Sequence, residues 1–129
     1  MKVYSFEKLE CWKNARQLAF WIYQVTANFP IEERYGITSQ MRRASISVAS
    51  NISEGCARAT AKDQARFNTF AYSSAIELLN QLIISNDLSY ISNEILEEGR
   101  NKIEITTYQI AQLKKYQLSQ VTTKISKSI

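Results

Sequence analysis

The stretch QMRRASISVASNISEGCAR, from Gln40 to Arg58, is the part of this chain that decides the fold. At the 100° per residue of an α-helix, it separates polar from apolar side chains into two neighbouring arcs of about 80° each. The polar arc consists of Arg43, Ser47, Asn51, Glu54 and Arg58, and the apolar arc of Met41, Ala44, Val48, Ile52 and Gly55, together with Ile37 just before the stretch. A polar stripe beside an apolar seam points partly inward. We therefore expect the polar side chains of the stripe to determine which helix packs against this one.

Three other segments have helical periodicity, and only three glycines and one proline interrupt the chain. We expect the first helix over 6–28, where Phe29-Pro30 ends it because a residue before proline avoids the helical region. The second helix is expected over 38–58. Thr60 and Ser92 are expected to cap the third and fourth helices. Short connections predict a single all-α, up-down-up-down antiparallel four-helix bundle over 1–118, followed by a basic, flexible tail over 119–129.

Composition limits the function classes. The chain of 129 residues carries a net charge of +4, contains no histidine, and has two cysteines without metal-ligand spacing. Histidine is the commonest general base and metal ligand, so we expect no enzyme, no metal and no cofactor. No apolar run approaches the roughly 20 residues of a membrane span, and no export segment is evident. We therefore expect a soluble, cytoplasmic protein without a membrane partner.

The charges also predict a specific helix pairing. If the second and third helices form a hairpin that turns near residue 60, facing positions have numbers that add to about 120. This sets Arg43 opposite Glu77, Glu54 opposite Arg66, and Ser47 opposite Ser73. We expect a polar ladder along this seam, completed by Asn51, in which two arginines meet two carboxylates. The ladder either fixes register and orientation or, as the alternative, provides a carboxylate site at Glu54 and Glu77.

The third helix has a second apolar line, at Tyr72, Ile76, Leu79 and Ile83, besides the one that a bundle core needs. This surplus favours a homo-oligomeric interface, and a wide core face in a small bundle is the alternative explanation. The four lysines of the last sixteen residues, Lys114, Lys115, Lys124 and Lys127, have two interpretations. They contact a polyanion such as nucleic acid, or they solubilise a disordered end.

Several spaced motifs resemble one family, the small four-helix bundle proteins encoded within intervening sequences of bacterial 23S ribosomal RNA genes. The matching positions are Leu9 and Trp12; Pro30, Glu33, Tyr35, Gly36, Ile37 and Gln40; Arg43, Ala44, Ser47 and Val48; Asn51, Ile52, Glu54 and Gly55; and Ser73, Ser74 and Glu77. The resemblance covers about Leu9 to Leu113. Ser53 departs from the usual alanine and Ser73 from the usual glycine, which could loosen one close helix contact.

This family is similar to the accessory variability protein of diversity-generating retroelements, a pentameric barrel of four-helix bundles that works with a reverse transcriptase and nucleic acid. The resemblance implies a homopentamer, a nucleic-acid ligand and a protein partner of the reverse-transcriptase kind. It implies no enzymatic activity.

Two functions are open at this stage. The first is an oligomeric scaffold that binds RNA or DNA through backbone phosphates. Its candidate residues are Arg34, Arg42, Arg58, Lys62, Lys114, Lys115, Lys124 and Lys127, with Arg42 expected to point away from the seam that occupies Arg43. The second is a protein-interaction adaptor without nucleic acid, marked by an exposed aromatic patch from Phe20, Trp21 and Tyr23. Core or subunit packing is the simpler role of those aromatic side chains.

Overall fold

The computed structural model describes the backbone of residues 1–128 and the side chains of residues 1–120. Its elements, in chain order, are the 3-10 helix η1 (Ser5–Lys8), α1 (Glu10–Thr26), the 3-10 helix η2 (Ile31–Glu33), α2 (Ile37–Cys56), α3 (Ala61–Asp87) and α4 (Asn93–Ser128). No residue of the described range 1–128 is in a β-strand. The all-α prediction is therefore confirmed.

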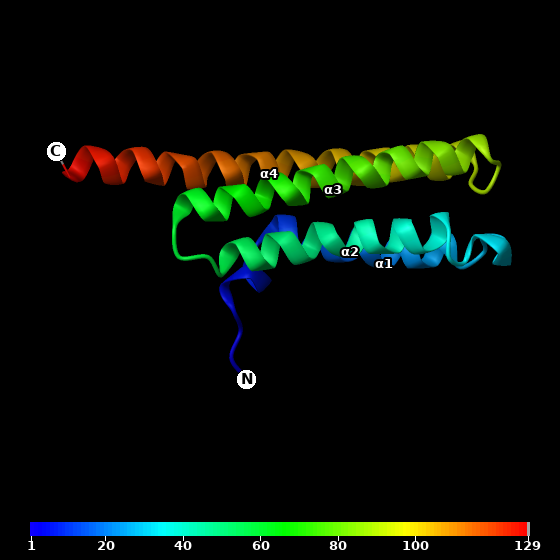
Figure 1. Cartoon of the computed structure of the whole chain (residues 1–129), viewed down its shortest axis with the longest axis horizontal. Helices are drawn as coiled ribbons and strands as arrows, with labels where there is room; N and C mark the ends of the chain where they lie inside the picture. The colour runs from blue at the N-terminus through cyan, green and yellow to red at the C-terminus, as the bar shows by residue number, and fades with distance from the viewer. Residues whose placement is uncertain (129) are drawn as a thin grey trace.

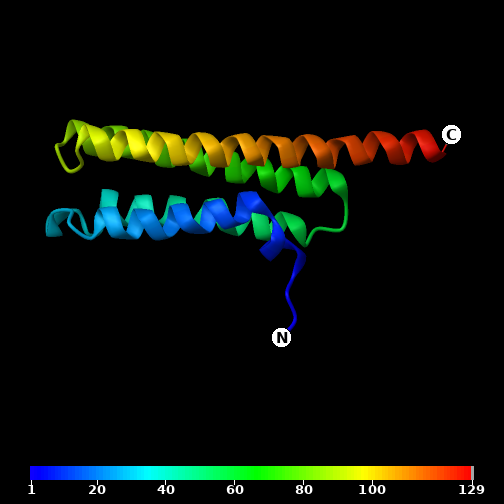
Figure 2. The ribbon, with the colours of Figure 1, turned by 180° about the vertical axis from the view of Figure 1, so that it is seen from behind.

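The helices form two layers, with α1 beside α2 in one and α3 beside α4 in the other (Figures 1 and 2). Successive helices run in opposite directions, as an up-down-up-down bundle requires. In both views α4 extends past the connection between α2 and α3, and it ends at Ser128. The helix thus continues beyond residue 118, where we placed the end of the bundle. A flexible tail stays a prediction, and the side chains of Lys124 and Lys127 lie outside the described residues.

Local sequence signals place the starts of α3 and α4. The Thr60 hydroxyl accepts a hydrogen bond from the backbone N–H of Asp63 at 3.2 Å, and the Ser92 hydroxyl accepts one from Ile95 at 3.2 Å. Both predicted N-caps are confirmed, because each hydroxyl satisfies a backbone donor that the first turn leaves free. The first helix differs from the prediction, since Leu9 adopts an extended conformation (φ −75°, ψ 128°) and separates η1 from α1.

The core lies along the inner faces of all four helices. Its fully buried large side chains are Leu18 and Ile22 of α1, Met41, Val48 and Ile52 of α2, Leu78 and Leu82 of α3, and Ile103 and Ile110 of α4. Small side chains at Ala71 and Ala75 let α3 approach the others closely. Among the described residues, no helix combines the length and apolar character that crossing a lipid bilayer requires.

The two layers are joined at the end of the bundle where η2 lies. The Tyr90 hydroxyl, from the connection between α3 and α4, donates to the Glu33 Oε2 at 3.2 Å. The Tyr90 ring also packs on Phe29, with ring centroids 5.3 Å apart. Desolvation and the nearby negative charge of Glu33 raise the pKa of Tyr90, so this phenol stays a hydrogen-bond donor at neutral pH.

Candidate functional site

The polar stripe of α2 meets α3 through a pair of hydroxyl groups. The Oγ atoms of Ser47 and Ser74 lie 2.9 Å apart. The side-chain amide of Asn51 donates to the carbonyl oxygen of Ser47 at 2.9 Å and to its Oγ at 3.0 Å. We expected Ser73 opposite Ser47, but Ser73 is exposed and Ser74 takes that place. The predicted register is therefore correct to within one residue.

The charged rungs of the predicted ladder are absent, so this part of the prediction is wrong. Arg43, Glu54 and Glu77 are exposed, and none of them forms an ion pair with a described side chain. Arg66 pairs instead with Asp63, with 3.0 Å between its Nη2 and the carboxylate Oδ1. Asp63 lies one turn before Arg66 on the same helix, which makes this pair easy to form. The other charges lie on the outer flanks of the seam, where water solvates them.

Gly55, near the C-terminal end of α2, lets α2 and α3 approach closely. A Cβ atom added to Gly55 would lie 2.9 Å from the Cβ of Phe67 and 3.2 Å from the carbonyl oxygen of Gln64. The Phe67 ring is in turn contacted by two guanidinium groups, with the Arg58 Cζ at 4.3 Å and the Arg66 Cζ at 5.3 Å from its centroid. Backbone contact and cation–π packing therefore close the place where we expected an ion pair.

The two adjacent arginines of α2 have exchanged their expected roles. The Arg42 Nε donates to the Thr26 Oγ1 at 2.9 Å, and the Arg42 Cζ lies 4.6 Å from the ring centroid of Tyr23. Arg42 thus joins α2 to α1, whereas Arg43 extends into solvent. Arg42 points away from the α2–α3 seam as expected, but it is not free to contact a phosphate, because a rotation of 100° per residue turns it toward α1.

Unpaired lysines gather at one end of the outer groove between α3 and α4. Two adjoining hollows there have volumes of about 580 and 520 Å³ and share Thr69, Lys114 and Leu118. The charged side chains that line them are Lys62, Asp63, Arg66, Lys114 and Lys115. Four cations face one carboxylate, so these residues carry a net charge of +3. We call these two hollows the basic end of the groove.

Three lysines of the basic end are free to bind an anion. Lys62, Lys114 and Lys115 form no ion pair with any side chain of residues 1–120. Lys62 comes from the first turn of α3 and the other two from α4, so the fold joins residues more than fifty positions apart in sequence. A cluster of free cations on two rigid helices is suited to binding phosphate groups.

The remaining candidate cations do not join this cluster as free groups. Arg34 follows η2, at the opposite end of the bundle from the connection between α2 and α3 (Figure 1), and its Cζ lies 5.4 Å from the Tyr35 ring centroid. Arg58 lies near the basic end, but its Nε is 3.9 Å from the Asp63 Oδ2. Only part of the predicted set is therefore brought together.

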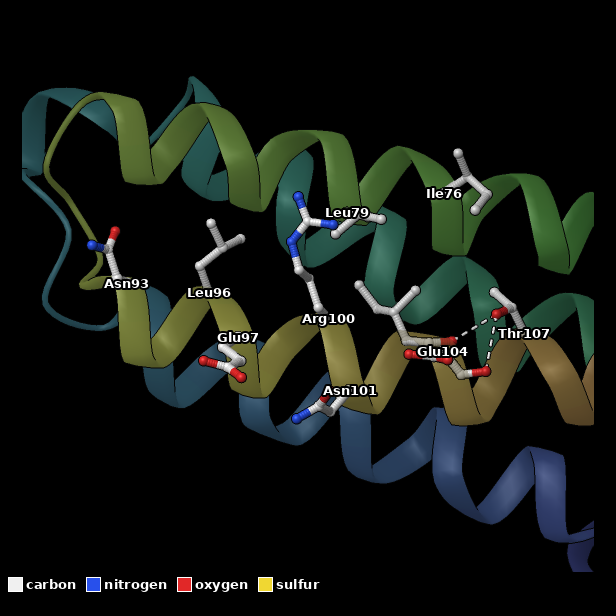
Figure 3. Close-up of a pocket in the computed structure, with 10 residues that line it drawn as sticks. Ile76, Leu79, Asn93, Leu96, Glu97, Arg100, Asn101, Glu104 and Thr107 are labelled. Carbon is white, nitrogen blue, oxygen red and sulfur yellow. Dashed lines mark hydrogen bonds between the residues drawn. The ribbon is translucent and has the colours of Figure 1, made fainter.

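The other end of the groove has the opposite charge. A hollow of about 640 Å³ is lined there by Glu97, Arg100 and Glu104, above the apolar side chains of Ile76 and Leu79. Figure 3 shows Arg100 reaching from α4 toward α3, with both carboxylates on α4. Because two carboxylates outnumber one cation, this hollow disfavours the binding of a polyanion. We call this hollow the acidic end of the groove.

One residue of the basic end was not among the predicted site residues. Asn68 is buried, its Nδ2 donates to the Gln117 Oε1 at 2.7 Å, and its Oδ1 has no hydrogen-bond partner. The available signal was an asparagine on the buried line of α3, three residues before Ala71 and seven before Ala75. A polar side chain on the apolar face of a helix breaks the apolar periodicity, and such departures are expected at functional sites.

Two observations concern the metal-binding and nucleophilic side chains of the described residues. No group of three or more cysteine or carboxylate side chains is arranged to hold a metal ion within them. Burial raises the pKa of the Cys11 thiol to about 11, so this sulfur stays protonated and unreactive at neutral pH.

Comparison with known proteins agrees with this fold. A family model described as the 23S rRNA-intervening sequence protein matches residues 7–112. The chain belongs to this family. Its fold is similar to the crystal structure of a protein of unknown function from the S23 ribosomal protein family of Bacteroides thetaiotaomicron. The TM-score is 0.58 at 19% sequence identity, over 84% of this chain and 95% of the other. No curated protein matches the sequence.

Proposed function

We propose that this member of the family is a subunit of a homo-oligomeric, non-catalytic scaffold that binds RNA or DNA through backbone phosphates. The observation that carries the proposal is the set of three unpaired lysines, Lys62, Lys114 and Lys115, on the two helices of the basic end. Phosphate contacts from lysine supply most of the affinity of sequence-independent nucleic-acid binding. The family's description, which refers to an intervening sequence of 23S rRNA, supports an RNA-related setting.

Exposed apolar side chains on α3 support self-assembly. Ile76 belongs to the second apolar line of this helix and is 45% exposed in the single chain, and Ile84 is 41% exposed. A monomer leaves this surface in water, whereas a second copy would cover it. We propose a homopentamer, with the number taken from the family resemblance. A ring would multiply the charge of each basic end and so the avidity for a long polyanion.

Replacement of Ile76 by glutamate tests the assembly. Ile76 lies at the acidic end of the groove, so Ile76→Glu adds a charge that a subunit interface would have to bury. We expect sedimentation or light scattering to show an oligomer for the wild-type chain and a smaller species for the variant. Ile105→Glu is the matched control, because Ile105 is an exposed isoleucine of α4 outside the groove hollows. A wild-type chain with the mass of a monomer would contradict the proposed assembly.

Neutralising two lysines of the basic end tests the nucleic-acid site. The double variant Lys62→Gln, Lys114→Gln removes two unpaired positive charges and keeps a flexible polar side chain at each position. We expect weaker binding of a fluorescent RNA in an anisotropy titration, with the slope of log affinity against log salt smaller by about 1.5. The salt series should run from about 50 to 200 mM, because affinity that rests on phosphate contacts falls steeply across this range.

The control carries the same change of charge at the other end of the bundle. Arg34→Gln, Arg100→Gln also removes two positive charges, but from positions outside the basic end. We expect it to leave the salt slope nearly unchanged. Equal losses from both double variants would mean that net charge, and no particular site, attracts the RNA. Binding that ignores salt would contradict a phosphate-driven mode.

One observation favours the alternative, a protein-interaction adaptor. Phe20 is 68% exposed and Tyr23 is also exposed on α1, as the predicted aromatic patch requires. Trp21 does not take part, because it packs against α4, where a Cβ added to Gly99 would lie 3.0 Å from its ring. The patch is thus smaller than expected. Under this alternative the partner is a protein, of which a reverse transcriptase is the example that the resemblance implies.

A further inference from the structure

One hollow of the basic end is lined by a residue with a buried polar atom that has no hydrogen-bond partner among the described residues. We call it the Asn68 hollow; it is the one of about 520 Å³ and is lined by α3 and α4. Asn68 is 1% exposed, and its Oδ1 makes no hydrogen bond. If the amides of Asn68 and Gln117 were both turned over, Nδ2 would take the same place without a partner. In either orientation one polar atom of Asn68, buried beside the hollow, has no hydrogen-bond partner among the described residues.

The walls of the Asn68 hollow suit a flat, mostly apolar group. Ile110 is buried at its base, while the ring of Tyr72 and the side chain of Leu118 are partly exposed beside it. Ser73 and Ala111 are small, so the two helices leave open space between them here. The volume lies within the range of about 300 to 1,000 Å³ that is typical of small-molecule sites. An exposed aromatic ring beside such a space can stack on a planar ligand.

The neighbouring hollow supplies the anion site. Lys114 lines both hollows, Lys62 and Arg66 line the second, and Lys115 lines the Asn68 hollow itself. The part of a bound ligand that projects out of the Asn68 hollow therefore passes several cations. A planar ring with polar edges that is attached to a phosphate is the chemical description of a nucleotide.

We propose that the Asn68 hollow binds one unpaired nucleobase of single-stranded RNA or DNA, with its flanking phosphates on Lys114, Lys115 and Lys62. The inference rests on the proposed nucleic-acid binding at the same end and adds the form of nucleic acid that is recognised. Base edges carry both donors and acceptors, so a base can satisfy the free atom of Asn68. The bases of a duplex are stacked and paired, so only an unpaired base can enter a hollow between two helices.

The acidic end of the groove does not share these properties. Glu97 and Glu104 would repel a phosphate that approached it. The Thr107 hydroxyl is already used, because it donates to the Ile103 carbonyl oxygen at 2.9 Å (Figure 3). The base site is therefore expected at the basic end alone.

Blocking the hollow from its exposed side tests the proposal. Ala111 is exposed and lines the Asn68 hollow, so Ala111→Trp fills the space with little risk to the fold. The probes are a short fluorescent RNA of mixed sequence, a DNA of the same sequence, and the RNA duplex. We expect the wild-type chain to prefer the single strands over the duplex. Ala111→Trp should remove this preference and leave duplex binding unchanged, and Tyr72→Leu should weaken single-strand binding about tenfold.

Matched controls use positions outside the hollow. Gln112→Trp places the same ring on the next residue of α4, and Tyr108→Leu removes an exposed tyrosine of the same helix. Both should bind single strands like the wild-type chain. A difference between the RNA and DNA arms would show whether the sugar 2′-OH is also read.

Three results would overturn this inference, and they differ from a failure of the proposed function. The first is a wild-type chain that binds single strands and duplex equally, with salt dependence intact, which would leave phosphate binding standing without a base site. The second is Ala111→Trp with an undiminished single-strand preference. The third is Ala111→Trp that changes the mass of the oligomer, which would show that a second copy of the chain covers the hollow. Absence of any nucleic-acid binding would instead refute the proposed function itself.

Discussion

Helix α3 packs against α2 on one side and against α4 on the other, and the two seams differ in how closely the helices approach. Toward α2, Gly55 lets the backbones come together, and a pair of serine hydroxyls joins the helices at 2.9 Å. Toward α4, the core side chains meet on the inner face, but the outer edge opens into the hollows of the basic and acidic ends. The first seam is closely packed at Gly55 and Ser47, whereas the second leaves room for a ligand.

This difference separates the residues that define the fold from those available for binding. On the closed seam Ser47, Asn51 and Ser74 bond to one another, although the Gln81 Oε1 of α3 is also buried without a partner among the described residues. On the open seam three lysines and one atom of Asn68 lack partners among the described residues. What distinguishes the open seam is that these groups line hollows large enough to hold a ligand, so they are available for binding.

The largest expected effect comes from forcing the closed seam apart. Gly55→Val places a branched side chain where a single Cβ would already lie 2.9 Å from Phe67 and 3.2 Å from the backbone oxygen of Gln64. The backbone oxygen cannot move without shifting α3. We expect the free energy of unfolding to fall by about 2 to 3 kcal/mol, measured by chemical denaturation.

The open seam provides the matched control. Ala111→Leu also enlarges a side chain beside α3, but into space that is open to solvent. We expect a change within about 0.5 kcal/mol, as is usual for surface substitutions. Similar losses from the two variants would mean that the outer groove is as tightly packed as the α2–α3 seam, which would remove the basis of the comparison.

The sequence predicts those features that depend on one helix at a time. The hydroxyls of Thr60 and Ser92 cap their helices as expected because a cap is decided within four residues of chain. The apolar line through Val48 and Ile52 is buried as expected because periodicity alone defines it. The break at Leu9 was missed, since no glycine or proline marks it.

The sequence does not predict how each helix is rotated about its axis. The rule that facing positions add to about 120 gives the right height, and Ser47 meets Ser74. Equal height does not bring Arg43 and Glu77 face to face, because the direction of each side chain depends on the packing of all four helices. The Asn68 hollow was missed for a related reason, since it forms only where small side chains of two distant segments meet.

A smaller effect distinguishes the two arginines of α2. Arg42→Ala removes the hydrogen bond to the Thr26 hydroxyl and the cation–π contact with Tyr23, both of which join α2 to α1. We expect a loss of about 1 to 2 kcal/mol in unfolding free energy, because a partly buried hydrogen bond from a charged donor contributes in this range. Thermal and chemical denaturation of the same variant should agree on the sign.

Arg43→Ala is the counterpart and the smallest of these effects. Its guanidinium is exposed and forms no ion pair with a described side chain, so we expect less than about 0.5 kcal/mol. The pair of variants compares the same residue type at adjacent positions, which makes propensity and charge effects nearly equal. If Arg43→Ala cost several kcal/mol and Arg42→Ala almost nothing, α2 would have to be rotated by about one residue, or 100°, from the orientation described. The hydroxyl pair of Ser47 and Ser74 would then also be lost, so this single comparison tests the whole closed seam.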